Sequence, residues 1–212
     1  MTRHGLLCHQ TLPVVTAHGE RVIVLSRMHS PVRRGEVAHL NNWAKKRGFA
    51  TFSIVDCDFE GAGDAIWNYG TGEIFGGHGF RTDPKAYEIL RDQFGLTIHP
   101  LKLVDANYYH LDTCFVVLGA DTAAYLPKAF DQPSQEILRA QFPRLIEIDE
   151  AEARLCFAGN ATAIGGHTVV LQKGSTHFQN HLREIGLKVI EVETGEFIKG
   201  GGSVFCMKQL LF

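Results

Sequence analysis

The fold is decided by residues 73–103, EIFGGHGFRTDPKAYEILRDQFGLTIHPLKL, which hold three elements in a row. The apolar runs Glu73–Gly77 and Thr97–Leu103 each predict a strand. Between them, Asp83 is suited to cap a helix and Pro84 is suited to its first turn, while apolar residues recur every three or four positions. This order of strand, helix and strand indicates an α/β chain.

The same arrangement recurs along the chain. Further amphipathic helices are predicted from about Glu36 to Arg47, from near Ser134 and from near Ser175. Strand-like runs flank these helices at Arg21–Ser26, Thr51–Val55, Ala123–Pro127, Leu145–Ile148, Thr168–Gln172 and Lys188–Val192. The unit is strand, strand, helix, strand, and its period of about 44 to 52 residues indicates a repeat architecture. Nothing interrupts the repeat, so we expect residues 1–212 to form a single domain.

Four units are complete in this sequence and a fifth is not. The pattern predicts Ser203–Phe212 as a closing strand, the first strand of the fifth unit. Residues 1–20 are too few for the rest of that unit, so we expect them to be an irregular or truncated first unit. An incomplete unit exposes strand edges and core, so we expect a second copy, in a homo-oligomer, or a rearranged N-terminus to cover this surface.

The composition of the chain argues against several classes of partner and site. The chain has 21 basic and 23 acidic residues without a basic stripe, so we expect no nucleic-acid partner. We identify no signal peptide and no run of membrane-spanning length, so we expect no membrane partner and a cytoplasmic location. The five cysteines form no CxxC pair, which argues against a disulfide framework and a thiolate zinc site. The N-terminal histidines and Cys8 lack a recognised ligand spacing, so we expect no metal.

Short motifs carry the reactive groups. Cys206 follows three glycines near the C-terminus, His110 and Asp112 lie two positions apart, and Glu60 and Asp64 flank a glycine-rich turn. A thiol, an imidazole and several carboxylates are the groups that a covalent thiol enzyme needs. Each also has an ordinary alternative. The cysteine could be a small buried hydrophobe, the histidine a core or loop residue, and the two acids turn residues that cap backbone amides.

These motifs, in this order on a ββαβ repeat, resemble the pentein superfamily of guanidine-modifying enzymes. Its members include arginine deiminases, dimethylarginine dimethylaminohydrolases and glycine amidinotransferases. The resemblance extends from about Glu20 to Phe212. It implies an α/β propeller of pseudo-fivefold ββαβ repeats, of which this chain has four complete units and an incomplete fifth.

The resemblance also implies a role for each motif. Cys206 matches the family's nucleophile and His110 its general acid and base. Glu60 matches the carboxylate that holds the guanidinium group and partners the histidine. Asp112 matches a second guanidinium-binding acid of the members with His-x-Asp, whereas dimethylargininases often carry lysine there. That difference favours the arginine deiminase or amidinotransferase side of the family.

Three further residues are candidate substrate ligands. Arg33 and Arg81 match basic residues that hold the substrate α-carboxylate in dimethylargininases, and both equally fit a solvated position before a helix. Asp64 is the remaining candidate acid, with the turn role as its alternative. No metal and no organic cofactor is needed for this chemistry.

The expected reaction is hydrolysis at the guanidinium carbon of arginine or a methylated arginine. It would pass through a covalent S-alkylthiouronium on Cys206 and give citrulline with ammonia or methylamine. The expected partner is therefore a small-molecule guanidine. Two alternatives stay open. An amidinotransferase would pass the same intermediate to an amine, and a catalytically impaired scaffold would result if the short N-terminus removes part of the substrate site.

Overall fold

The computed structural model describes residues 10–209 and 211, and within them the chain folds as four ββαβ units, each with its own three-stranded sheet. The first unit comprises β1 (Thr11–Val15), β2 (Arg21–Leu25), α1 (Arg34–Lys46) and β3 (Ala50–Ser53). The second comprises β4 (Ala65–Asn68), β5 (Glu73–His78), α3 (Lys85–Phe94) and β6 (Ile98–Lys102). The third comprises β7 (Phe115–Gly119), β8 (Thr122–Tyr125), α4 (Gln132–Gln141) and β9 (Arg144–Glu147). The fourth comprises β10 (Thr162–Ile164), β11 (Thr168–Gln172), α6 (Thr176–Glu184) and β12 (Lys188–Val192).

All four sheets share one topology. The second strand lies in the middle, antiparallel to the first strand and parallel to the third, as in β4-β5-β6. Among residues 10–209, three short α-helices lie outside this pattern: α2 (Gly61–Asp64), α5 (Glu150–Cys156) and α7 (Gly195–Ile198). The predicted α/β class and the four repeats are therefore confirmed.

The local signals explain most element boundaries. The α3 helix begins where the Asp83 carboxylate accepts the Lys85 N–H at 2.8 Å, and it ends at Gly95, whose φ of 66° is left-handed. The α4 helix starts two residues before the predicted Ser134, because Asp131 caps it by accepting the Ser134 N–H at 3.0 Å. The predicted bounds of β11 and β12 agree with the structure.

Two predictions about the chain ends need correction. Residues 1–20 are not all irregular, because β1 occupies Thr11–Val15 and pairs with β2; residues 1–9 lie outside the described part. The closing strand predicted at Ser203–Phe212 is wrong for the described residues 203–209, which form turns and irregular backbone. The Met207 N–H bonds back to the Ser203 carbonyl at 3.1 Å, so the backbone turns where an extended strand was expected.

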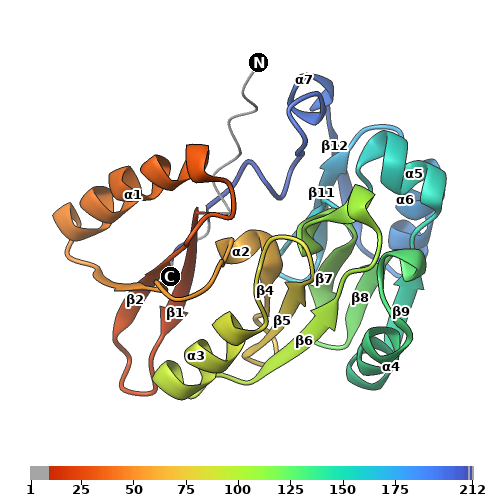
Figure 1. Cartoon of the computed structure of the whole chain (residues 1–212). Helices are drawn as coiled ribbons and strands as arrows, with labels where there is room; N and C mark the ends of the chain where they lie inside the picture. Colours follow the sequence, from red (N-terminus) through yellow and green to blue (C-terminus); the bar gives the residue numbers. More distant parts are fainter. Residues whose placement is uncertain (1–9, 210, 212) are drawn as a thin grey trace.

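The strands lie inside the molecule and the longer helices at its periphery (Figure 1). The first strands of successive units meet there, since β7 contacts both β4 and β10. The rings of Phe75, Phe115 and Phe142 join the second and third units, with centroids 4.8 to 5.9 Å apart. The loops that enter β4, β7 and β10 therefore converge, and these loops carry the candidate site. No helix in the described part of the chain is long and apolar enough to cross a bilayer.

Candidate active site

Cys206 is fully buried and lies between an acceptor and a donor. Its Sγ is 2.9 Å from Oδ2 of Asp112, which accepts the thiol hydrogen. On the other side, the Asn160 side-chain amide donates to Sγ at 3.1 Å. The nucleophile that the sequence predicts is thus held in a polar site, which is not how a small buried hydrophobe sits.

His110 and Asp112 occupy one short 3-10 turn. His110 occupies the N-cap position of the turn Leu111–Thr113, and the Thr113 hydroxyl donates to the His110 carbonyl at 2.6 Å. The imidazole Nε2 lies 2.5 Å from Oε2 of Glu60, and both side chains are buried. Because His110 and Asp112 are two residues apart, the His110–Glu60 pair and the Asp112–Cys206 pair meet on one short turn.

Glu60 is fixed from several directions at the entrance to α2. Its own N–H donates to the Thr82 hydroxyl at 3.0 Å. Its Oε1 accepts the His29 backbone N–H at 3.0 Å, and Nη1 of Arg81 lies 3.9 Å from the same oxygen. A carboxylate held by donors on fixed backbone is well oriented to receive a planar cation.

Asp64 lies beneath this pair. One carboxylate oxygen accepts the Thr82 hydroxyl at 2.7 Å, and the other accepts the Leu111 N–H at 3.0 Å. Burial raises the pKa of Asp64 to about 6, although His110 and these hydrogen bonds act in the opposite direction. These contacts tie the Glu60 loop to the His110 turn, which matches the turn alternative; direct substrate binding by Asp64 stays a prediction.

Arg81 lies at the edge of the cluster. Its guanidinium carbon is 4.6 Å from the centroid of the Tyr109 ring, and that ring is 4.9 Å from the ring of His110. The Arg81 side chain is 29% exposed, so its head can meet a ligand without moving through the core. The structure thus brings Arg81 to the site.

Arg33 is placed differently. It ends the 3-10 turn before α1, and its guanidinium binds Glu36 at 3.3 Å. Gln10 donates to the same carboxylate at 2.6 Å. The described side-chain contacts of Arg33 are with Glu36 and not with the other six candidates, so its contact with a substrate stays a prediction.

Asn160 is the site residue that the sequence reasoning missed. It is fully buried, and its amide also donates to the Asp112 carbonyl at 2.8 Å. The preceding Gly159 allows this approach, because a Cβ there would lie 2.6 Å from the Thr113 carbonyl oxygen. A signal did exist in the repeat period. His110 follows Glu60 by 50 residues, and Asn160 stands at the same step in the next unit.

The other described cysteines are poor nucleophiles. Burial raises the pKa of Cys57 and Cys156, and it raises the pKa of the fully buried Cys114 far more. Cys8 lies outside the described residues. Within the described residues, no three or more histidine, cysteine or acidic side chains gather as a set of metal ligands.

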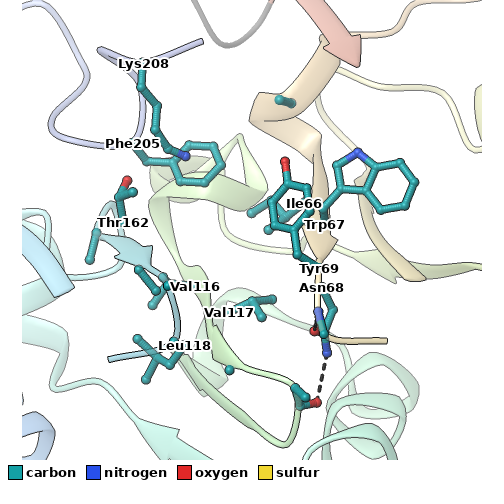
Figure 2. Close-up of a pocket in the computed structure, with 18 of the residues that line it drawn as sticks. Ile66, Trp67, Asn68, Tyr69, Val116, Val117, Leu118, Thr162, Phe205 and Lys208 are labelled. Atoms are coloured by element: carbon teal, nitrogen blue, oxygen red, sulfur yellow. Dashed lines mark hydrogen bonds between the residues drawn. The ribbon is translucent and has the colours of Figure 1, made fainter. Parts of the chain in front are cut away.

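An open apolar pocket of about 350 Å³ adjoins the site without containing it. Its walls come from β4, β7, β10 and the C-terminal segment. In Figure 2, Trp67 and Tyr69 lie on one side of the pocket, while Phe205 and Lys208 lie on the other. Phe205 and Ala161 line it and are chain neighbours of Cys206 and Asn160, so the pocket begins directly behind the reactive cluster.

The comparisons with known proteins agree with one another. The sequence profile of a family described as "N,N dimethylarginine dimethylhydrolase, eukaryotic" matches residues 13–212. The N(G),N(G)-dimethylarginine dimethylaminohydrolase of Mycobacterium tuberculosis is 37% identical over 198 residues, which are 91% of this chain and 64% of that protein. The bifunctional arginine dihydrolase/ornithine cyclodeaminase ArgZ of Synechocystis is 33% identical over 192 residues, 89% of this chain and 27% of ArgZ. This chain thus spans less than two thirds of the length of either relative.

Solved structures show the same fold. A substrate-bound mutant of the N-terminal domain of ArgZ, described as an arginine dihydrolase from cyanobacteria, gives a TM-score of 0.87 at 30% identity, covering 94% of this chain and 72% of that one. A dimethylarginine dimethylaminohydrolase adduct with S-methyl-L-thiocitrulline gives a TM-score of 0.75 at 22% identity, covering 93% and 73%. The second likeness concerns the fold alone.

Proposed function

Because this chain belongs to the N,N-dimethylarginine dimethylhydrolase family, we propose that it is a hydrolase of the guanidinium carbon of arginine or a methylated arginine. One observation carries the proposal. The Cys206 thiol lies 2.9 Å from the Asp112 carboxylate, and two residues away the His110 imidazole lies 2.5 Å from the Glu60 carboxylate. This arrangement supplies a nucleophile, an acid–base group and two carboxylates for a planar cation.

Substrate binding is assigned to the two carboxylates. Glu60 and Asp112 would each accept N–H groups of the guanidinium ion through charge-assisted hydrogen bonds. Because Asp112 already contacts Sγ, a guanidinium ion bound to it would lie next to the sulfur. Arg81, partly exposed at the edge, would hold the substrate α-carboxylate.

The bound cation also activates the thiol. Before it binds, the Asp112 carboxylate disfavours a negative sulfur, and the thiol proton stays on Sγ. The positive charge of the bound guanidinium ion favours a negative sulfur. The thiol proton therefore leaves to solvent, and the Cys206 thiolate forms next to the guanidinium carbon.

The remaining steps use His110 twice. The Cys206 thiolate bonds to the guanidinium carbon, and His110 gives a proton to the departing ammonia or methylamine as the C–N bond breaks. This leaves an S-alkylthiouronium on Cys206. His110 then takes a proton from water, whose oxygen bonds to the same carbon, and the C–S bond breaks. The proton left on that oxygen passes to the departing sulfur, so the Cys206 thiol is regenerated and the urea group of citrulline remains.

For the fold, we propose a pentein propeller with an incomplete fifth unit. The four ββαβ units and the likeness to the ArgZ domain support it. The names of the relatives, a dimethylarginine dimethylaminohydrolase and an arginine dihydrolase, support an arginine-type substrate. A cytoplasmic location and a second copy over the missing unit stay predictions.

The test uses 2-chloroacetamidine, an amidine that alkylates thiols, at neutral pH on the full chain. Intact-protein mass spectrometry should find one adduct on the wild-type chain, protection by arginine, and no adduct on Cys206→Ala. Incubation with arginine and with methylated arginines should then release citrulline.

The two alternative functions, amidino transfer and a non-catalytic scaffold, would each give a different result. A new guanidino product in the presence of an acceptor amine, without citrulline, would identify an amidinotransferase. No adduct, or labelling spread over several cysteines, would show that the site is not assembled and would leave a scaffold. Either result overturns hydrolysis.

A further inference from the structure

We infer that Asn160 is a further catalytic residue, which holds the Cys206 thiolate through its side-chain N–H and fixes the backbone that carries it. The inference rests on the proposed function for its place in the reaction. Its physical content, the effect of Asn160 on Cys206, is measurable without turnover.

The contacts of Asn160 use its whole amide group. Nδ2 donates to Cys206 Sγ at 3.1 Å and to the Asp112 carbonyl at 2.8 Å. Oδ1 accepts the Ser203 N–H at 3.0 Å and the Cys206 N–H at 3.4 Å. The Asn160 backbone carbonyl accepts the Phe205 N–H at 3.1 Å. One fully buried residue therefore contacts the nucleophilic atom, its carboxylate neighbour's backbone and the turn that presents the sulfur.

Asp112 and Asn160 have opposite effects on the charge of Sγ. The Asp112 carboxylate favours the thiol, because it accepts the thiol hydrogen and repels a negative sulfur. The Asn160 N–H can donate to either form, but it binds a negative sulfur more strongly. When a guanidinium ion engages Asp112, the Asn160 donor stays in place. Asn160 thus supplies thiolate stabilisation that needs no rearrangement during the reaction.

The surrounding ionisable groups do not replace this contact. The acidic and basic side chains of the site are Asp112 and His110 before β7, Glu60 and Asp64 before β4, and Arg81 after β5. Asn160 approaches from the loop that enters β10, and it brings an uncharged donor. Its loss should therefore change the ionisation of Cys206 while the charge of every neighbouring group is kept.

The measurement is the pH dependence of Cys206 alkylation by 2-chloroacetamidine, followed by mass spectrometry of the Cys206 peptide. The quantity compared is the midpoint, the pH at which the alkylation rate is half of its plateau. Removing one donor to a charged group should raise this midpoint by roughly one to two pH units in Asn160→Ala. Asn160→Asp keeps an oxygen for the Ser203 and Cys206 N–H groups but adds a negative charge, so its midpoint should be higher still. The expected order is wild type, Asn160→Ala, Asn160→Asp.

Gln172→Ala is the matched control. Gln172 is another buried amide that supports the same turn, since its Oε1 accepts the Thr194 N–H and the Thr194 hydroxyl contacts the Ser203 hydroxyl at 2.6 Å. It does not touch Sγ among the described contacts. Its midpoint should equal that of the wild type.

The outcomes separate the two claims. An unchanged midpoint in Asn160→Ala, or an equal rise in Gln172→Ala, overturns the inference and leaves a purely structural role. Should Asn160→Ala fail to fold, an unchanged midpoint in Asn160→Asp overturns it equally. Raised midpoints in a protein that forms no citrulline would retain the inference about the thiolate while the proposed function fails.

Discussion

At the scale of single residues, the candidate site depends on hydroxyl and carboxyl groups that hold its loops together. Thr82 donates to Asp64 and accepts the Glu60 N–H, while Asp64 accepts the Leu111 N–H next to His110. The Glu60–His110 pair is thus set by a chain of buried hydrogen bonds. Such chains are costly to interrupt, because each group left behind is buried without its partner.

Thr82→Val tests this chain at its centre. Valine keeps the shape of threonine but leaves the Glu60 N–H and the Asp64 carboxylate without their hydroxyl partner. We expect a loss of roughly 1–3 kcal/mol in the free energy of unfolding, measured by chemical denaturation, and a lower rate of citrulline formation. Thr82→Ser retains the hydroxyl and should behave like the wild type. Equal stability of the valine and serine variants would contradict the argument.

Asp64 predicts a pH dependence of stability. Its pKa is about 6 in the folded chain against an ordinary 3.8, so the folded state holds the proton more tightly between these values. The contribution of Asp64 to stability is therefore greatest below about pH 4 and falls as pH rises to about 6, by roughly 3 kcal/mol in total. Asp64→Asn cannot ionise. Its stability relative to the wild type should rise over that window in denaturation curves at pH 4 and pH 7.5, and parallel curves would refute this.

At the scale of elements, the site is built where a strand packs against a turn. Gly77 in β5 lies against the turn Leu111–Thr113, and an added Cβ would stand 2.7 Å from the Leu111 Cβ and 3.3 Å from the Asp64 carboxylate. Neither neighbour is the free end of a flexible chain. The spacing between β5 and this turn therefore requires glycine.

Gly77→Ala should consequently push the His110 turn away from Glu60. Overpacking of this kind costs roughly 1–3 kcal/mol, and the displaced imidazole should lower kcat/KM for arginine as well. Gly119→Ala is the control, because a Cβ there meets nothing within 4 Å. Thermal melts and steady-state kinetics on the two variants check the prediction. A Gly77→Ala enzyme with wild-type kinetics would show that the turn tolerates the shift.

The same scale explains what the sequence could and could not predict. Periodicity located β11 and β12 because their apolar alternation and bounding turns are local signals. The closing strand at Ser203–Phe212 was wrong over the described residues because the Asn160 side-chain oxygen accepts the Ser203 and Cys206 N–H groups from 43 and 46 residues earlier in the chain. The fixed contacts of Asp64 were equally invisible, since they depend on partners brought in by the fold. Motif order could nominate Cys206, His110, Asp112 and Glu60, but it could not reveal their spacing.

At the scale of the whole molecule, the open apolar pocket is the feature that a single copy leaves uncovered. Tyr69, one of its lining residues, is 67% exposed, and Val15 at the end of β1 and Ile164 at the end of β10 are 51% and 54% exposed. Exposed apolar surface around a pocket is characteristic of an interaction site. It agrees with the sequence-based expectation that a second copy covers part of this molecule.

We therefore expect a dimer in light scattering at micromolar concentration. Tyr69→Lys places a charge in the pocket and should shift the population to monomer. Leu155→Lys, at an apolar residue of α5 that is 73% exposed and does not line the pocket, should leave the dimer intact. A monodisperse wild-type monomer would contradict the expectation.

Glu60, His110, Asn160 and Cys206 come from three different units and the segment that follows the fourth. A guanidinium ion held by Glu60 and Asp112 would join the second unit to the third, and the covalent intermediate would also fasten the C-terminal turn. Occupancy should then slow the partial opening of these units, and a protease that cuts the transiently opened chain should act more slowly on the alkylated protein. The ligand of this small chain would serve as a cross-link as well as a reactant.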